Sequence, residues 1–323
     1  MQTNFDIIPS TFGRYTTLEL KNQVTGEYLS VLPEVGGMLH CLELEFSGKL
    51  IPVLDSYKNA DELELTLTNT YKGSNLFPFP NRIDGGKYTF EGKENLLDIN
   101  FPHEKNAIHG LIYNQPFEVS KRKVSEEEAF LELQYSSDGK LKGYPYKFEL
   151  LVQFELNNEG IRVNTIVTNK SDSNIPVGNG WHPYFVLFDK ANEADLSFPS
   201  KEYYAVNDRM LPTGNTTEYR DFNSIKNLGT IHFDTCFSID GHGKQVETII
   251  KNKTLHAGLS VWQETGNNKF NYLQIYTPLD RSSIAIEPMT CLPNAFNNGT
   301  GYTVLKPKEV FSAAWGVRRL EIK

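Results

Sequence analysis

The sequence predicts an all-β protein, a large antiparallel β-sandwich or barrel-like stack of sheets with very little helix. Short runs of alternating apolar and polar residues recur along the 323-residue chain, and this period of two is typical of half-buried strands. Clusters of Asn, Gly, Asp and Pro separate the runs, as turns do between antiparallel strands. The chain also carries 20 Phe, 16 Tyr and 3 Trp, and such rings fit a pleated, half-buried surface.

The clearest strand is predicted over Tyr146–Leu156, where apolar residues at every second position share one face and charged or amide residues share the other. Asn157–Gly160 supplies turn residues, and Ile161–Thr168 alternates again, which predicts a hairpin. The segment Ser56–Leu67 predicts a turn or two of helix. Further strands are expected at Tyr15–Leu20, Tyr28–Leu32, Leu42–Phe46, Phe117–Val124, Ala129–Tyr135, Leu259–Trp262, Tyr272–Tyr276, Ile284–Glu287 and Val310–Leu320.

We expect a single domain over residues 1–323. No linker rich in Pro, Gly or Ser and no change in composition divides the chain, and no repeat of solenoid or propeller length is present. Large all-β domains commonly exceed about 200 residues. The length therefore predicts one large sandwich.

The charge balance argues against nucleic acid and against an anionic membrane surface as partners. Asp and Glu number 40 against 32 Lys and Arg, a formal net charge of −8. The first residues do not resemble a signal peptide, and no apolar run approaches the roughly 18 residues of a membrane span. We therefore expect a cytoplasmic protein, with Cys41, Cys236 and Cys291 as reduced thiols.

Searches for cofactor and metal motifs favour acid–base chemistry by elimination. The sequence lacks a phosphate-binding loop, a zinc-protease motif and a serine-nucleophile elbow, and Gly178–Gly180 lacks the third glycine of a dinucleotide site. His103 and His109 form only a weak pair for a metal. We expect neither cofactor nor metal, and a site built from His, Glu, Asp and Arg.

Two turn-rich segments place polar residues in apolar surroundings. In Gly73–Gly86, prolines on both sides of Phe79 stiffen the chain before Asn81 and Arg82, and a stiff backbone holds the fixed donors of an arginine in place. Taken alone, this segment is more typical of a strand entry with a surface arginine. His109, which precedes a glycine, is suited either to donate to a ligand oxygen or to cap a turn.

Two further segments hold ionisable residues suited to proton transfer. His182 follows Trp181 and precedes a proline, which extends its backbone, and an imidazole with an ordinary pKa of about 6.5 both gives and takes protons near neutrality. Trp181 offers a flat apolar face of the kind that sugar rings favour. Glu287 and Ala285 share the face opposite Ile284 and Ile286, so Glu287 faces either a cleft or, as is usual for Glu, solvent.

In order along the chain, these segments resemble the aldose 1-epimerase (galactose mutarotase) family. The resemblance runs from about Leu76 to Glu309 and, with flanking strands, covers nearly the whole chain. Each motif is short, but several in the expected order are hard to obtain by chance. They are Asn-Arg-Ile at 81–83, His-Gly at 109–110, His-Pro-Tyr-Phe at 182–185, Phe-Asp-Thr-Cys-Phe at 233–237, Glu-Pro-Met-Thr through Gly299, and Leu-x-Pro-x-Glu at 305–309.

This resemblance implies a galactose mutarotase-like supersandwich that binds an aldohexose in an open cleft and interconverts its α and β anomers without a cofactor. It implies that Glu287 is the general base at the anomeric hydroxyl and that His182 is the general acid at the ring oxygen. It also implies that the sugar hydroxyls are held by other polar residues, namely Asn81, Arg82, His109 and Asp234. We add Trp181 to these as a candidate for contact with the ring.

The sequence departs from the better-known members of the family and leaves alternatives open. The approach to Asn81 is Leu-Phe-Pro-Phe-Pro rather than Gly-rich, as in a divergent branch. The segment after Gly110 lacks the arginine of a hexose-6-phosphate-like branch, which favours an uncharged sugar. A sugar-binding or regulatory protein without activity is one alternative. A glycosidase is another, and it would require Asp234 as the second carboxylate facing Glu287.

Overall fold

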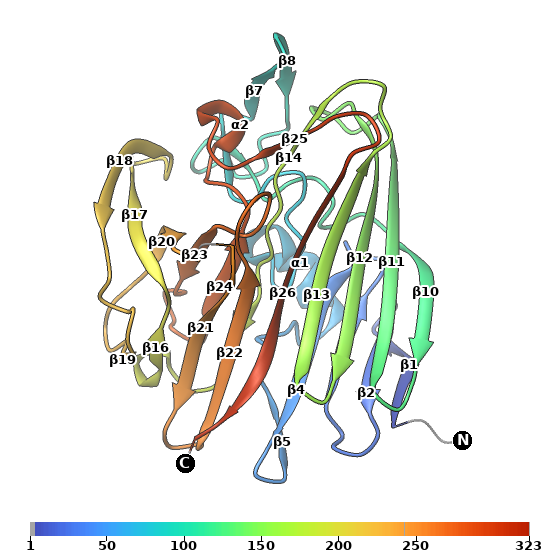
Figure 1. Ribbon diagram of the computed structural model, residues 1–323, viewed down its shortest axis with the longest axis vertical. Coiled ribbons are helices and arrows are strands. Elements are labelled where there is room, and N and C mark those ends of the chain that lie inside the picture. The colour runs from blue at the N-terminus through green and yellow to red at the C-terminus, as the bar shows by residue number, and fades with distance from the viewer. Residues whose placement is uncertain (1–3, 242, 323) are drawn as a thin grey trace.

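A computed structural model describes residues 4–241 and 243–322. In this part of the chain three large antiparallel sheets pack into a sandwich, which confirms the predicted fold class (Figure 1). Helix is confined to three short segments within the same ranges: α1 (Ala60–Thr70), the 3₁₀ turn η1 (Ala191–Glu193) and α2 (Ala295–Asn298). None of the described helices is long and apolar enough to cross a membrane.

A nine-stranded sheet forms one layer of the sandwich. Its strands follow, in spatial order, as β10 (Glu118–Val124), β11 (Glu128–Asp138), β12 (Lys147–Asn157), β13 (Gly160–Asn169), β26 (Val310–Glu321), β22 (Ala257–Glu264), β21 (Gln245–Asn252), β16 (Asp195–Ser197) and β19 (Lys226–Asn227). C-terminal strand β26 thus lies beside β13, in the middle of the sheet.

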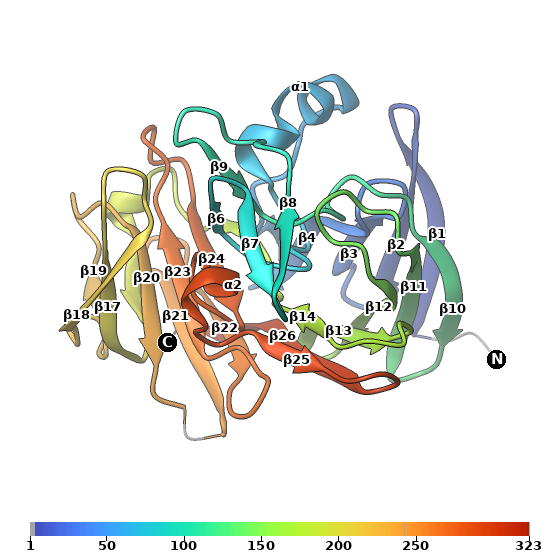
Figure 2. The same ribbon diagram turned by 90° about the horizontal axis from the view of Figure 1, so that it is seen from above.

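Two smaller sheets cover the two halves of this layer (Figure 2). One is a meander of β1 (Phe5–Phe12), β2 (Tyr15–Asn22), β3 (Tyr28–Leu32), β4 (Met38–Phe46) and β5 (Lys49–Pro52), in which β2 contacts β11 and β12. The other has the order β15 (Tyr184–Phe185), β24 (Ile284–Met289), β23 (Tyr272–Tyr276), β20 (Asp234–Ile239), β17 (Ser200–Val206) and β18 (Pro212–Glu218).

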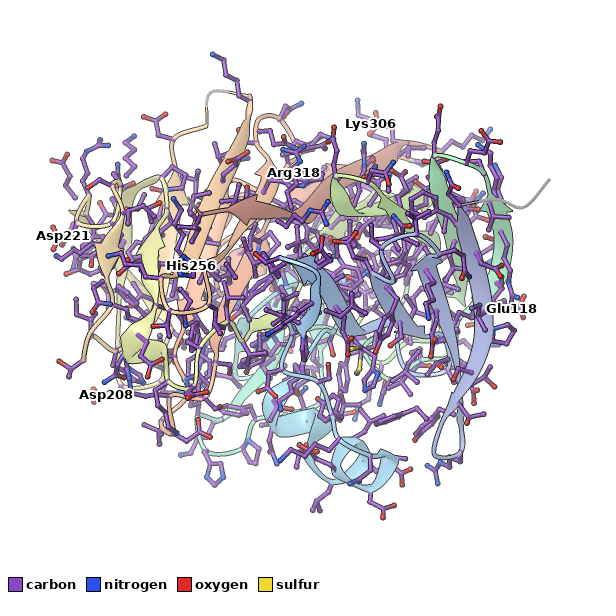
Figure 3. The ribbon with its side chains drawn as sticks, turned by 90° about the horizontal axis from the view of Figure 1, so that it is seen from below. Glu118, Asp208, Asp221, His256, Lys306 and Arg318 are labelled. Carbon is purple, nitrogen blue, oxygen red and sulfur yellow. The ribbon has the colours of Figure 1, made fainter. Side chains whose placement is uncertain are left out.

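One continuous apolar core fills the space between the layers. On β12, Phe148, Leu150, Val152 and Phe154 are buried at every second position, as the alternation predicts. The same core reaches Phe198 and Phe237 beneath the six-stranded sheet, which supports the proposal of a single domain. Charged side chains such as Glu118, Asp221 and Lys306 lie at the periphery (Figure 3).

The predicted strands are confirmed, most of them with ends shifted by a few residues. The helix differs more, because α1 begins four residues later than predicted and runs for 11 residues. Asn59 caps its start by accepting a hydrogen bond from the Glu62 backbone N–H, and Leu63 and Leu67 pack inward. All three cysteines are free, with Cys236 and Cys291 buried and Cys41 half-buried.

Three small two-stranded ribbons accompany the large sheets. They are β6 (Arg82–Asp84) with β9 (Asn106–Ile108), β7 (Lys87–Phe90) with β8 (Lys93–Leu96), and β14 (Ile175–Val177) with β25 (Thr303–Leu305). Of these ribbons, β6–β9 carries Arg82, and His109 follows directly after β9.

Candidate active site

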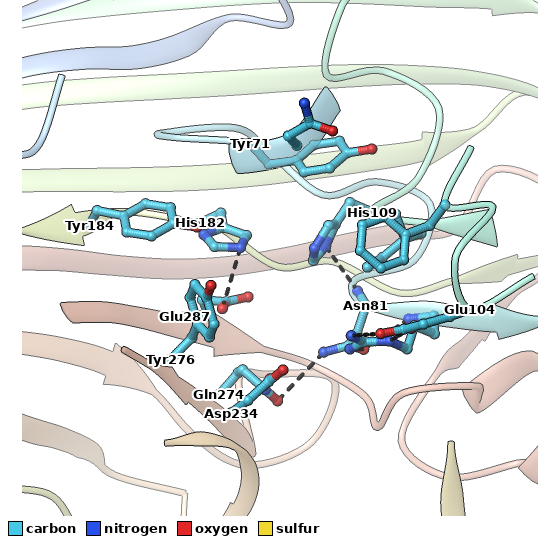
Figure 4. Close-up of a pocket in the computed structure, with 14 residues that line it drawn as sticks. Tyr71, Asn81, Glu104, His109, His182, Tyr184, Asp234, Gln274, Tyr276 and Glu287 are labelled. Atoms are coloured by element: carbon cyan, nitrogen blue, oxygen red, sulfur yellow. Dashed lines mark hydrogen bonds and ion pairs between the residues drawn. The ribbon is translucent and has the colours of Figure 1, made fainter. Parts of the chain in front are cut away.

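A pocket of about 620 Å³, counting the part open to solvent, lies between the six-stranded sheet, the β6–β9 ribbon and the end of α1. It brings together six of the seven side chains predicted from the sequence (Figure 4). These six are Asn81, Arg82, His109, His182, Asp234 and Glu287. Other lining residues are Asn69, Tyr71, Phe101, Glu104, Ile108, Tyr184, Gln274 and Tyr276.

The register of the six-stranded sheet builds the floor of the pocket. Glu287 on β24 is paired with Gln274 on β23, and Tyr276 of β23 is paired with Asp234 on β20. Because side chains on a strand alternate between faces, all four point to the same side. Ile286, on the opposite face, lies in the core. Glu287 is therefore buried at the base of a pocket, with 2% of its surface exposed, and it is not the solvated glutamate that is usual for this residue type.

Strand β24 ends at Met289, one residue after Pro288, and the Pro288 carbonyl accepts from the Trp181 backbone N–H. This contact belongs to the segment Gly178–His182, which runs beside β24. Gly178 and Gly180 let it approach closely, since an added Cβ would lie 2.7 Å from Cys291 Sγ or Pro80 Cβ. The glycines thus serve close packing, and the packing places His182 over Glu287.

His182 and Glu287 face each other across a short gap. Nε2 of His182 lies 3.4 Å from Oε1 of Glu287. The imidazole stacks on Tyr184, with ring centroids 4.8 Å apart, and its edge faces His109. The second oxygen of Glu287, Oε2, has no hydrogen-bond partner among the described residues. The pair is therefore oriented by its surroundings while one carboxylate oxygen stays free for a ligand.

Burial favours the uncharged form of each partner. It lowers the pKa of His182 to about 3. It also raises the pKa of Glu287 well above its ordinary value, and the nearby Asp234 adds to this shift while Arg82 opposes it. Both shifts favour the neutral pair, in which the transferable proton is on the carboxyl. Transfer of that proton to His182 would convert the neutral pair into a carboxylate and an imidazolium.

The backbone at Asn81 fixes the tautomer of His109. Asn81 and His109 both have left-handed backbone angles, with φ of 57° and 60°. The Asn81 N–H donates to His109 Nδ1 over 3.2 Å, while the His109 N–H donates to the Asn81 carbonyl over 2.9 Å. Since Nδ1 accepts, the neutral ring carries its proton on Nε2. Burial lowers the pKa of His109, as do His182 and Arg82, so this ring is a neutral donor.

Glu104 holds Arg82 in a two-point ion pair. The Arg82 Nε donates to Glu104 Oε2, and Nη2 donates to Oε1 over 2.9 Å. A third donor, Nη1, bonds to Asn81 Oδ1 over 3.0 Å. A guanidinium has five N–H groups, so two are left for a ligand. Arg82 is therefore a rigid donor whose charge is compensated by Glu104.

Arg209 fastens the loop that carries Glu104. It lies between β17 and β18, and its Nη1 is 2.7 Å from Asp84 Oδ1. Its other donors bond to the backbone carbonyls of Glu104 and Lys105 and to Asn106 Oδ1, over 2.7 to 3.0 Å. Contact between the β17–β18 turn and the β6–β9 ribbon thus supports the ion pair of Arg82 from outside the pocket.

Asp234 is held by an amide rather than by a cation. Its Oδ1 accepts from Gln274 Nε2 over 2.6 Å, and Asn81 Nδ2 donates to Gln274 Oε1 over 3.5 Å. Burial raises the pKa of Asp234, while Arg82 partly offsets this shift. A chain of hydrogen bonds therefore runs from Glu104 through Arg82, Asn81 and Gln274 to Asp234.

The structure corrects the placement of Trp181. Its side chain is fully buried in the core and does not line the pocket. It packs between Phe154 and Trp315, with ring centroids 6.0 and 5.9 Å away, and its Nε1 donates to Thr165 Oγ1 over 3.1 Å. In an extended segment neighbouring side chains point to opposite faces, so Trp181 turns inward where His182 turns to the pocket.

Several pocket residues were not predicted. Tyr184 is two residues from His182, and Gln274 and Tyr276 alternate on a predicted strand, so the period of two was a usable signal for all three. Glu104 and Tyr71 gave no such signal, because only the fold brings them to the site. Among the described residues no group of three His, Cys, Asp or Glu side chains is arranged to hold a metal ion.

Comparisons with known proteins identify the family that this chain matches. The family model described as aldose 1-epimerase matches residues 17–317. An uncharacterised protein of Escherichia coli K12, YihR, is 29% identical over 310 residues, which are 91% of this chain and 92% of YihR.

Solved structures share the fold. A galactose mutarotase-like protein from Clostridium acetobutylicum has a TM-score of 0.85 at 22% identity, covering 98% of this chain and 99% of that one. Galactose 1-epimerase from Lactobacillus acidophilus has a TM-score of 0.81 at 17% identity over the full length of both chains. The supersandwich of the galactose mutarotases is thus the fold of this protein, and with the family model spanning most of its length the chain belongs to the aldose 1-epimerase family.

Proposed function

We propose that the protein is an active aldose 1-epimerase that interconverts the α and β anomers of an uncharged aldohexose such as glucose or galactose. The observation that carries the proposal is the pair of His182 Nε2 and Glu287 Oε1, 3.4 Å apart in a buried pocket. Mutarotation needs one group to take the proton of the anomeric hydroxyl, O1, and a second to protonate the ring oxygen, O5. A pair that shares one proton supplies both.

In the proposed reaction the Glu287 carboxylate removes the proton from O1 while imidazolium His182 protonates O5. The bond from C1 to O5 breaks, and C1 and O1 become an aldehyde. Rotation about the bond between C1 and C2 turns the other face of the aldehyde to O5. In ring closure O5 attacks C1, His182 takes the O5 proton back, and Glu287 returns its proton to O1.

Burial assists the ring-opening half of this cycle. Opening converts the charged pair into protonated Glu287 and neutral His182, which are the forms that burial favours. The remaining polar side chains of the pocket would bind the other hydroxyls. Arg82 has two free N–H groups, His109 offers its Nε2–H, and Asp234 offers Oδ2 as an acceptor.

The compensated charge of Arg82 supports an uncharged substrate. Its guanidinium is already paired with Glu104, and the lowered pKa values of His109 and His182 keep these rings neutral in the empty pocket. A phosphate or carboxylate group on the sugar would thus meet no uncompensated cation among the described lining residues. This supports the expectation, drawn from the sequence, that free sugars are preferred.

The test is the exchange of anomers at equilibrium, followed by NMR, or the approach to equilibrium, followed by polarimetry. The protein should accelerate both for glucose or galactose above the rate in buffer. Glu287→Gln should remove at least about 99% of the acceleration, as should His182→Gln, since a positioned acid or base supplies roughly 10²–10⁴-fold. Glu149→Gln, on the outer face of β12, is the matched control and should keep full activity.

The alternatives give different results in the same experiment. A protein that only binds sugars would bind glucose, but the rate of anomer exchange would equal the rate in buffer. Glu287→Gln would then leave this rate unchanged. A glycosidase would release the chromophore from a nitrophenyl glycoside, and Asp234→Asn would stop that release. Either result would refute the proposal of an epimerase.

A further inference from the structure

The chain around Ser74 runs antiparallel to the segment that carries His182. The His182 N–H donates to the Ser74 carbonyl over 3.1 Å, and the adjoining residues of the two segments, Asn75 and Trp181, form a bridge pair. Ser74 therefore lies opposite His182. Opposed residues of an antiparallel pair point to the same face, and neighbours along a chain point to opposite faces. The Ser74 side chain thus shares the face of the imidazole, whereas Trp181 enters the core.

Each of these two opposed side chains has a buried polar atom without a partner. Ser74 has 1% of its surface exposed and His182 has 5%. Ser74 Oγ and His182 Nδ1 both lack a hydrogen-bond partner among the described residues. Buried polar atoms are seldom left unpaired, and the Cβ atoms of opposed residues lie about 4.5–5.5 Å apart. The hydroxyl is thus within reach of Nδ1, either directly after rotation about χ1 or through one water molecule.

The ring of His182 is turned so that Nδ1 faces the chain around Ser74. Its other nitrogen, Nε2, faces Glu287. Burial lowers the pKa of His182 and the backbone carbonyl of His182 itself opposes this shift, which requires Nδ1, since only this nitrogen can approach the backbone of its own residue. The same carbonyl accepts from the Gly73 N–H over 2.9 Å, so it points toward the segment of Ser74. The contact within the residue does not have the geometry of a hydrogen bond, and Nδ1 still needs a partner.

Nδ1 of His182 is a donor in each protonation state that the proposed reaction uses. In the neutral pair the proton lies on the Glu287 carboxyl, so Nε2 of His182 accepts and the ring proton is on Nδ1. When His182 is an imidazolium, both nitrogens carry protons. A serine hydroxyl can accept as well as donate, and an acceptor at Nδ1 stabilises the imidazolium more than the neutral ring. The Ser74 hydroxyl would therefore favour transfer of the proton from Glu287 to His182.

The rings packed against His182 leave the position at Nδ1 to Ser74. Tyr184 stacks on the face of the imidazole, whereas an Nδ1–H bond lies in the plane of the ring. His109 meets the imidazole edge to face, but its own Nδ1 already accepts from the Asn81 N–H and its Nε2 carries a proton. Neither neighbouring ring can therefore accept from the Nδ1–H of His182.

From these observations we infer that Ser74 is a positioning residue for His182: its hydroxyl accepts from Nδ1–H and holds the tautomer in which Nε2 exchanges a proton with Glu287 and with the sugar. This inference rests on the proposed epimerase activity and deepens it. Ser74 does not line the pocket, so it acts on the sugar only through the imidazole. Its effect should appear in kcat and not in the binding of substrate.

The test compares Ser74→Ala with Ser260→Ala as a matched control. Ser260 is also 1% exposed, and its hydroxyl also lacks a partner among the described residues. It lies on β22, which contributes no lining residue to the pocket. Ser74→Ala should lower kcat for anomer exchange of glucose at least about tenfold, because a hydrogen bond to a group that becomes charged is lost, and KM should stay within about twofold. Ser260→Ala should change neither constant.

NMR of the protein with isotope-labelled histidine measures the contact itself, and His182→Gln assigns the signals of His182. At a pH between the lowered pKa of His182 and the raised pKa of Glu287, Nδ1 should carry the ring proton. Ser74→Ala should move the resonance of this proton upfield, because its hydrogen bond is lost, whereas Ser260→Ala should leave the resonance unchanged.

Three results would overturn the inference: the ring proton of His182 is on Nε2, Ser74→Ala leaves the Nδ1–H resonance unchanged, or Ser74→Ala leaves kcat unchanged in a protein that accelerates exchange. The epimerase activity is tested separately by the same variants. A protein that does not accelerate exchange, but whose Nδ1–H resonance depends on Ser74, would refute the epimerase activity alone.

Discussion

The ion pair between Glu104 and Arg82 lends itself to a quantitative test through Glu104→Gln. Arg82 is buried, with 7% of its surface exposed, and the Glu104 side chain is 18% exposed. The new amide group keeps one oxygen as an acceptor for Arg82, but its N–H group faces the second Arg82 donor. The substitution also leaves the charge of the Arg82 guanidinium uncompensated. A hydrogen bond to a charged group contributes about 1.5–3 kcal/mol. We therefore expect the free energy of unfolding to fall by about 2 kcal/mol.

The same change should act on the binding of substrate. In the proposed complex the two free N–H groups of Arg82 contact hydroxyls that do not react, so these contacts should be equally strong before and during ring opening. Without the ion pair the guanidinium shifts, so KM should rise by roughly 10- to 30-fold while kcat changes little. This rise corresponds to a loss of about 1.4–2 kcal/mol in the free energy of binding. Urea denaturation and polarimetric kinetics with glucose measure the two effects.

A matched control for this variant is Glu94→Gln, which breaks an ion pair with Lys87 that is about half exposed. Exposed pairs contribute about 0–1 kcal/mol, so stability and KM should stay close to those of the unmodified protein. The reasoning is refuted if Glu104→Gln gives the same KM as Glu94→Gln. It is also refuted if kcat falls as steeply as kcat/KM, because Arg82 would then act in the transition state.

Two further predictions concern the stability of the site and its support. His182 titrates at about 3 in the folded protein and about 6.5 in the unfolded chain, so between these values only the unfolded chain binds the proton. The free energy of unfolding should then fall by about 2 kcal/mol more in the unmodified protein than in His182→Gln between pH 6.5 and 4.5, measured by urea denaturation; equal losses would contradict the cause given. Trp181→Phe should lower stability by about 1–3 kcal/mol with KM for glucose unchanged, and a tenfold rise in KM at unchanged fold would place Trp181 at the substrate.

The alternation of side chains made most of the fold predictable. Along β12 it identified the buried face from Phe148 to Phe154, and on β24 it set Glu287 opposite Ile286. The prediction for β12 succeeds because a strand with one buried face is specified by local pattern. On β24, which is buried on both faces, the alternation separates the faces but does not tell which one meets a pocket. The helix begins at Ala60, later than predicted, because Asn59 caps it.

Contacts between distant segments were beyond sequence reasoning. Glu104 is 22 residues from Arg82, and Arg209 reaches the same loop from more than 100 residues away. No local pattern reports such a contact, since each residue is an ordinary charged residue of a turn or short ribbon. The burial that lowers the pKa of His182 to about 3 was equally hidden, because it depends on what the fold places around the ring.

The error at Trp181 has a different origin, because the sequence did hold the signal. His182 and Trp181 are neighbours in an extended segment, so one of them must face away from any pocket that the other faces. If the imidazole of His182 faces the ligand, the indole of Trp181 must therefore point into the core. By the same rule Tyr184, two residues after His182, must lie on the same face as the imidazole. The stacking of Tyr184 on His182 follows the same rule. Aromatic character alone predicted a sugar platform at the wrong residue, whereas the period of two leads from His182 to Tyr184, which does line the pocket.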